Sequence, residues 1–136
     1  MAVNTNPIFI ADRGAWPLEL DNADGTNALA LVVAGANGTL IEAIAATTTD
    51  TSDVEVDLLI SDGTTDYAVG SVTVPAGAGT DGGTTAAVDL LQQTDLQWLR
   101  EDLTLALTAG HTLKAGAHAA ITSAKVVHLV AFGGDY

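Results

Sequence analysis

Asp53-Val54-Glu55-Val56-Asp57-Leu58-Leu59-Ile60 is the stretch of this 136-residue chain that decides its fold class. Apolar side chains at positions 54, 56, 58 and 60 alternate with acidic side chains at 53, 55 and 57. A period of two places the apolar side chains on one face of a β-strand and the charged ones on the other. The sequence therefore predicts a half-exposed strand over residues 53–60.

The turn after this strand predicts the strand's partner. Asp62-Gly63-Thr64-Thr65 separates the first strand from a second run of β-forming residues, Asp66 to Val74, and Pro75 ends that run. Glycine after aspartate favours a tight connection, because glycine accepts a positive φ at little cost. We therefore expect a β-hairpin over residues 53–74.

Further runs rich in Val, Ile, Leu and Thr extend in both directions and are separated by Gly, Asp, Asn and Pro, which is the pattern of successive strands. These runs are 28–34, 39–46, 84–91, 103–107, 111–114, 117–123 and 125–132. Only 90–99 has weak helical character. Strand-like runs without intervening helices predict an all-β protein, namely an antiparallel β-sandwich with a jelly-roll-like arrangement. Because 48% of the residues are hydrophobic but only 4% are aromatic, we expect a core of Ala, Val, Leu and Ile.

The first residues differ from the rest. Residues 1–27 contain two of the three prolines, Pro7 and Pro17, which argue against a helix. We predict an extended N-terminal arm over 1–27 and a β-sandwich domain over 28–136. Two forms of the arm remain open: a first strand followed by a loop, or a segment that becomes ordered only against a neighbouring subunit.

The charge balance restricts the partners. Seventeen acidic residues against four Lys and Arg give a net charge of −13. Binding to nucleic acid requires clustered cations, and the same acidity disfavours anionic membranes, so we expect neither partner. No run approaches the roughly 18 apolar residues of a membrane span, and the N-terminus does not resemble a secretion signal. We expect the chain to be made in a cytosol.

Three histidines are the main candidates for chemistry: His111, His118 and His128. They lack a neighbouring catalytic motif, and the spacing of the first two matches no metal motif. The pattern favours surface or interface histidines. Two alternatives remain: a ring of histidines around a symmetry axis that makes assembly depend on pH, and a cupin-like metal site built from all three. We predict no enzymatic activity, no catalytic residue and no cofactor.

Acidic and glycine-rich loops offer weaker signals. Oxygen ligands from such loops are what calcium prefers, but the spacing here is not that of an EF-hand, and turns with solvated carboxylates explain it better. The acidic residues concerned are Asp21, Asp24, Asp62, Asp66 and Asp81. The segment 77–83 lacks the lysine of a phosphate-binding loop. We interpret it as a loop that fits against a partner.

Large apolar side chains outside the predicted core point to interfaces, which favour aromatic rings. Trp16 is the best anchor, because a tryptophan in an extended segment gains most by filling a pocket on a neighbour. The alternative, which is equally open, is that Trp16 folds back onto its own sandwich. The predicted interface residues, for contact with a protein partner or another subunit, are Ile8, Phe9, Ile10, Trp16, Trp98 and Tyr136.

Four segments resemble the small capsid decoration, or cement, proteins of tailed bacteriophages. In order, these segments are Gly38-Thr39-Leu40-Ile41-Glu42-Ala43-Ile44, Ile60-Ser61-Asp62-Gly63-Thr64-Thr65-Asp66-Tyr67, Val74-Pro75-Ala76-Gly77-Ala78-Gly79-Thr80-Asp81-Gly82-Gly83, and Val130-Ala131-Phe132-Gly133-Gly134-Asp135-Tyr136. The resemblance is one of style and segment order over roughly residues 35–136. It does not include the arm.

The resemblance implies a β-sandwich protein that forms a homotrimer on the outer face of the virion head. There it would bind the major capsid protein and bridge neighbouring capsid subunits, without an active site. The alternative is another virion component with a similar body, such as a head fibre base or a tail-associated receptor-binding module.

Overall fold

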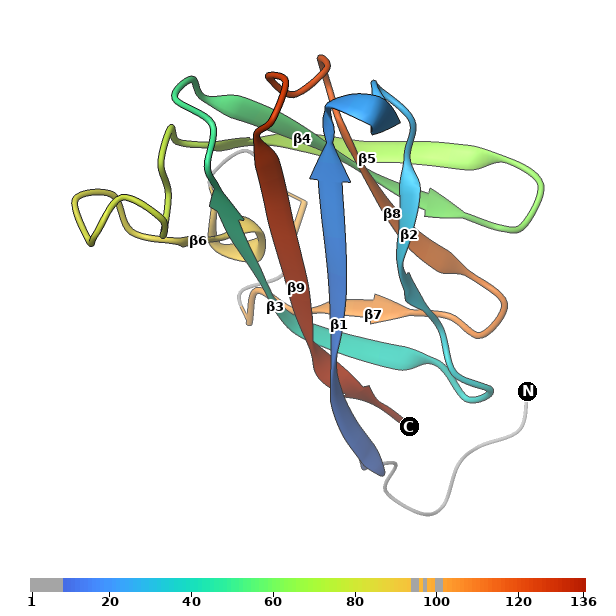
Figure 1. The fold of residues 1–136 in the computed structure, drawn as a ribbon. Coiled ribbons are helices and arrows are strands. Elements are labelled where there is room, and N and C mark those ends of the chain that lie inside the picture. Colours follow the sequence, from blue (N-terminus) through green and yellow to red (C-terminus); the bar gives the residue numbers. More distant parts are fainter. Residues whose placement is uncertain (1–8, 94–95, 97, 100–101) are drawn as a thin grey trace.

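The computed structural model describes residues 9–93, 96, 98–99 and 102–136. Over these residues the chain forms two antiparallel β-sheets and two one-turn 3-10 helices (Figure 1). The strands are β1 (Asp12–Asp21), β2 (Leu29–Val33), β3 (Thr39–Thr48), β4 (Val54–Ser61), β5 (Asp66–Val74), β6 (Val88–Asp89), β7 (Leu105–Leu107), β8 (Thr112–Ala117) and β9 (Val126–Asp135). The 3-10 helices are η1 (Asn22–Asp24) and η2 (Leu90–Gln92).

Successive strands along the chain mostly alternate between the two sheets. One sheet, here called sheet A, has the order β1-β9-β3-β6, with β7 also paired to β3, and the other, sheet B, has the order β2-β8-β4-β5. Apart from the β4–β5 hairpin and the β6–β7 connection, each step along the chain moves from one sheet to the other. The predicted all-β antiparallel sandwich is confirmed, and this strand order is compatible with the jelly-roll-like arrangement.

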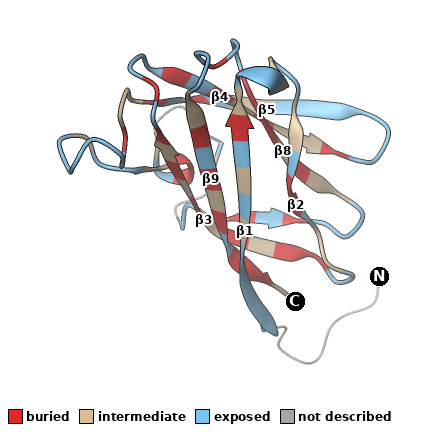
Figure 2. Ribbon diagram, in the orientation of Figure 1, coloured by how far each residue is buried: buried red, intermediate tan, exposed pale blue. Residues whose placement is uncertain are grey.

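Small aliphatic side chains fill the space between the sheets. Among the described residues, every buried hydrophobic side chain is Leu, Val, Ile or Ala, as the aromatic-poor composition predicts. In β4 the alternation is as expected, with Val54, Val56 and Leu58 buried and Ile60 partly buried against the same core. Figure 2 shows this alternation of buried and exposed positions along several strands.

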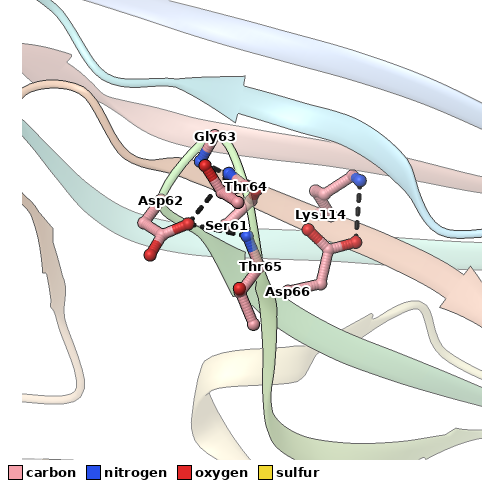
Figure 3. Close-up of polar contacts among 7 residues, drawn as sticks. All are labelled: Ser61, Asp62, Gly63, Thr64, Thr65, Asp66 and Lys114. Atoms are coloured by element: carbon pink, nitrogen blue, oxygen red, sulfur yellow. Dashed lines mark hydrogen bonds and ion pairs between the residues drawn. The ribbon is translucent and has the colours of Figure 1, made fainter.

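The predicted hairpin is confirmed, and β5 has the expected bounds. Asp62 N donates to Thr65 O at 3.2 Å, which closes the turn. Gly63 has a φ of 94°, a conformation in which side chains with a Cβ are strained. The Asp62 carboxylate accepts hydrogen bonds from the backbone N–H groups of Thr64 and Thr65 (Figure 3). Asx geometry and the glycine thus specify this connection locally.

Most of the predicted arm is a strand of the sandwich. β1 pairs with β9 over ten residue pairs, and Leu20 at its end is buried in the core. The division at residue 27 therefore does not correspond to a boundary in the structure, and the strand-plus-loop form describes residues 12–27. Pro17 is compatible with this position because β1 lies at the edge of sheet A, where a missing N–H removes no ladder bond. Residues 1–8 lie outside the described part of the chain.

Two other predicted strands are wrong or shortened. Residues 118–125 form a loop rather than a strand, because Thr122 bonds to the Asp50 carboxylate and Ala124 adopts a φ of 65°. The run 84–91 contributes only the short β6 and η2. Here the carboxylate of Asp89 caps η2 at Leu91 N and also accepts from Ile44 N, and these polar contacts end the strand.

Candidate functional site

Three rows of side chains cross the outer face of sheet A. The register of β1, β9 and β3 aligns their outward residues, so that each row has one member from each strand. The first row is Ala15, Phe132 and Ala43, the second is Pro17, Val130 and Ala45, and the third is Glu19, His128 and Thr47. We call these nine residues the three-row face. Its first two rows are entirely apolar.

The outward direction of these rows follows from their neighbours. Residues that alternate with them along the strands, such as Leu129, Ala131 and Ile44, are fully buried in the core. Side chains alternate between the two faces of a strand, so the rows face away from the core. Phe132 is 44% exposed there, which is unusual for a phenylalanine at the centre of a sheet.

An ionic contact lies at each end of the three-row face. Beyond the first row, Arg13 Nη1 lies 2.8 Å from Glu42 Oε2. In the third row, His128 Nε2 lies 2.7 Å from Glu19 Oε2. A hollow of about 480 Å³ lies beside this second pair, between Pro17 and Val130. The face thus combines an apolar centre with an ion pair at one end and a histidine–carboxylate contact at the other.

The outer face of sheet B is polar by contrast. In its register Glu55 lies opposite Thr73, and Asp57 lies opposite Ser71. Asp57 accepts a hydrogen bond from the Ser71 hydroxyl and lies 3.0 Å from His118 Nδ1. The hydrogen bond and the charge of Asp57 raise the pKa of His118. The two outer faces of the sandwich therefore differ in chemistry.

Ser71, Asp57 and His118 are not arranged as a catalytic triad. In a triad the imidazole contacts the serine hydroxyl and takes its proton. Here the carboxylate lies in the middle and contacts both other residues. The hydroxyl thus contacts the carboxylate and not the imidazole, and the three residues form a polar cluster on the surface of sheet B.

The three histidines do not converge. His118 contacts Asp57 on sheet B, whereas His128 contacts Glu19 on sheet A. Across the described ranges, no three His, Cys, Asp or Glu side chains lie close enough together to hold a metal ion. The cupin-like site proposed from all three histidines is therefore not assembled here.

The acidic turns use their carboxylates locally. Asp66 forms an ion pair with Lys114 Nζ at 2.8 Å, next to the Asp62 turn (Figure 3). Asp81 accepts from Thr85 N at 2.8 Å across the glycine-rich loop. Hydrogen bonds from these partners hold the pKa of all three carboxyl groups below the usual value. These contacts favour the turn interpretation over calcium binding.

Two of the predicted interface residues share a groove. Trp98 and Tyr136 line a depression of about 480 Å³, together with Leu40 of β3 and Leu105 of β7. Trp98 is 47% exposed, and its Nε1 donates to Val69 O at 2.6 Å. Val69 is the extra residue of a bulge in the edge strand β5. Trp98 therefore covers part of an edge that is otherwise open to another strand.

The other predicted interface residues lie apart from this groove. Trp16 is partly buried and packs on its own core, as its alternative interpretation predicted. Phe9 is 76% exposed, and Ile10 lies against Gly134, where a Cβ would collide with it. Ile8 lies outside the described residues. The three-row face was not predicted, because the alternation in β1 was assigned to an arm.

Asp50 was also missed, although it is a buried carboxylate that accepts three hydrogen bonds. It is 3% exposed and accepts from Ser52 N, Thr122 N and Thr122 Oγ1 at 3.0–3.1 Å. Burial alone would raise the pKa of Asp50. The hydrogen bonds lower the pKa by more than burial raises it, so the net pKa lies below the usual value. The Asx pattern Asp50-Thr51-Ser52 was the available local signal; the partner Thr122 is 72 residues away.

No protein-family model, curated protein or solved structure matches this chain. In the described part of the chain, no helix is both long enough and apolar enough to span a bilayer.

Proposed function

We propose that this chain is a structural virion protein that binds the outer surface of a tailed-phage capsid. It stabilises the shell by bridging neighbouring major capsid subunits, and it needs neither catalysis nor a cofactor. The resemblance of four segments to capsid decoration proteins motivates this role. It also implies a homotrimer.

The difference between the two outer faces of the sandwich is the observation that supports this proposal most. Sheet A presents two apolar rows, the first centred on Phe132, whereas sheet B presents acids and hydroxyls along β4 and β5, although Val33 and Tyr67 are also exposed on its strands. An apolar sheet face suits a contact with protein, and a polar one suits solvent. A sandwich with one face of each kind is suited to an assembly in which the apolar face is covered by protein and the polar face remains in water.

The charge and the loop chemistry are consistent with the same role. A net charge of −13 keeps free copies dispersed until they meet a complementary surface. The carboxylates of Asp50, Asp62 and Asp81 are engaged in closing loops. Loops whose carboxylates are bonded internally are consistent with a protein that works by contact.

The test uses particles of the virus that encodes this chain, made without its gene. Purified chain is added back, and two quantities are measured: the amount that sediments with the particles and the temperature at which they release DNA. The proposal predicts saturable binding and a higher release temperature. Failure to sediment with the particles would refute the proposal.

The groove that contains Trp98 and Tyr136 favours a second candidate, a head fibre base or a tail-associated receptor-binding module. Exposed aromatic rings beside a depression are what a receptor-binding tip requires. This candidate predicts that the purified chain binds host cells, and that Trp98→Ala abolishes the binding. The decoration role predicts no binding to cells.

A further inference from the structure

We infer that the three-row face of sheet A is the surface through which copies of this chain contact one another. The occupant of the face is a second copy of the same chain. Because the same face is used by both copies, the contact closes a dimer rather than the homotrimer that the resemblance implies, and the inference does not depend on the virion role. It follows from the composition of the face, its charge and its size.

The small local charge of the three-row face favours contact between copies. Copies that each carry −13 repel one another, so they associate only where the local charge is small. The three-row face and the ion pair beyond its first row contain one arginine and two glutamates. With the histidine counted neutral, the net charge of this area is −1.

The placement of those charges supports the same occupant. Arg13 is bound to Glu42 at one end of the face, and His128 is bound to Glu19 at the other. A face meant for a basic partner would present uncompensated acids, which this chain has in abundance elsewhere. A face with one neutralised pair and a single net negative charge instead matches a surface that is itself nearly neutral and mainly apolar, and a second three-row face has that composition.

The size of the three-row face determines how strong this contact can be. The three rows span five residues of each strand, residues 15–19, 128–132 and 43–47, so the three-row face measures about 17 Å by about 14 Å. Two such faces bury about 480 Å² before side-chain relief is added, which is less than the roughly 1,000 Å² of a stable specific interface and is typical of weak contacts. The contact is therefore expected to be reversible and concentration-dependent.

Edge pairing is a poorer route to the same association. Pro17 removes a donor from the middle of the β1 edge, and Trp98 covers the bulge of the β5 edge. Growth of either sheet by strand addition is thus obstructed. The exposed apolar rows of the face have no such obstacle.

The experiment measures mass by light scattering and sedimentation velocity over a wide range of protein concentration. Phe132→Glu places a charge in the first row, and Tyr67→Glu is the matched control, because Tyr67 is also an exposed ring, at 54%, but lies on β5 of sheet B. The wild type is expected to exceed the 13.7 kDa chain mass as concentration rises. Phe132→Glu should weaken association at least tenfold, and Tyr67→Glu should leave it unchanged.

Ala15→Glu serves as the second variant, because Ala15 is exposed on the edge strand and its replacement leaves the core intact. Circular dichroism confirms that each variant is folded. A wild type that stays monomeric at every concentration overturns the inference. So does an assembly that both face variants leave intact. If the wild type is monomeric while Phe132→Glu abolishes particle binding, the face belongs to the capsid partner and the inference is equally wrong.

Discussion

Replacing Asp50 by alanine is expected to destabilise the sandwich by about 3 kcal/mol. The buried carboxylate accepts three hydrogen bonds, two from Thr122 and one from Ser52. A hydrogen bond to a charged group contributes about 1.5–3 kcal/mol, but Asp50, Ser52 and Thr122 line a surface pocket, so water can replace some of what is lost when the carboxylate is removed. The net cost of about 3 kcal/mol reflects the loss of the hydrogen bonds that hold the 118–125 loop to the loop after β3.

Thermal unfolding followed by circular dichroism measures this effect. An unfolding entropy of about 2.1 cal/mol/K per residue converts 3 kcal/mol into a fall in Tm of about 10 °C for 136 residues. Asp53→Ala is the matched control in the same segment. Its exposed carboxylate accepts a single hydrogen bond, from Ala76 N, so it should cost at most about 1 kcal/mol.

The same variant predicts a pH dependence. The folded-state pKa of Asp50 lies below its unfolded value, so its contribution is complete above about pH 4 and is lost as the pH falls through the folded pKa. The stability difference between wild type and Asp50→Ala should therefore be constant near neutral pH and shrink in acid. Equal Tm values for Asp50→Ala and Asp53→Ala, or a difference that grows in acid, would refute the reasoning.

Three further substitutions test the packing of the sheets, each by thermal or denaturant unfolding. Gly133→Ala should cost about 3 kcal/mol, because its Cβ would meet a backbone carbonyl of β3. Gly14→Ala is the control: Gly14 pairs with Gly133 but has open space around it, so this variant should be nearly neutral. Equal costs for the two variants would contradict the register. Gly63→Ala should cost about 1 kcal/mol through its positive φ alone, and Gly63→Asn should recover part of that loss; a neutral alanine variant would contradict the turn geometry. Trp98→Phe should cost about 1 kcal/mol by removing the donor to the bulged carbonyl of β5, and an unchanged stability would show that this hydrogen bond contributes nothing.

The sequence was informative where structure is determined locally. The strand over 53–60, its turn and its partner follow from a period of two and from the Asp-Gly pair, and all lie within 22 residues. The aliphatic core likewise follows from composition. In these parts, local preference and the final fold agree, and no distant contact is needed to predict them.

Long-range contacts account for what the sequence analysis missed. β1 alternates Trp16, Leu18 and Leu20 with outward residues, but its partner β9 lies more than 100 residues away, and Pro17 masks the pattern. Residues 117–123 have the composition of a strand, yet Thr122 is held by a carboxylate on a distant loop. Propensity cannot anticipate such partners.

The candidate surface was harder to predict than the fold. The aromatic residues chosen from the sequence scatter in the structure: Trp16 packs inward, and Trp98 and Tyr136 meet in a groove. The three-row face consists mainly of alanine, proline and valine, which carry no signal of function singly. Only the register of three strands brings them together with Phe132.

Quantitative mass spectrometry of purified particles of the encoding virus tests the central claim most directly. The account predicts that this chain is present at a copy number of the same order as that of the major capsid protein, and that protease added to intact particles can reach it. Particles that are complete and stable without the chain, or that contain it only in traces, would contradict the proposed structural role.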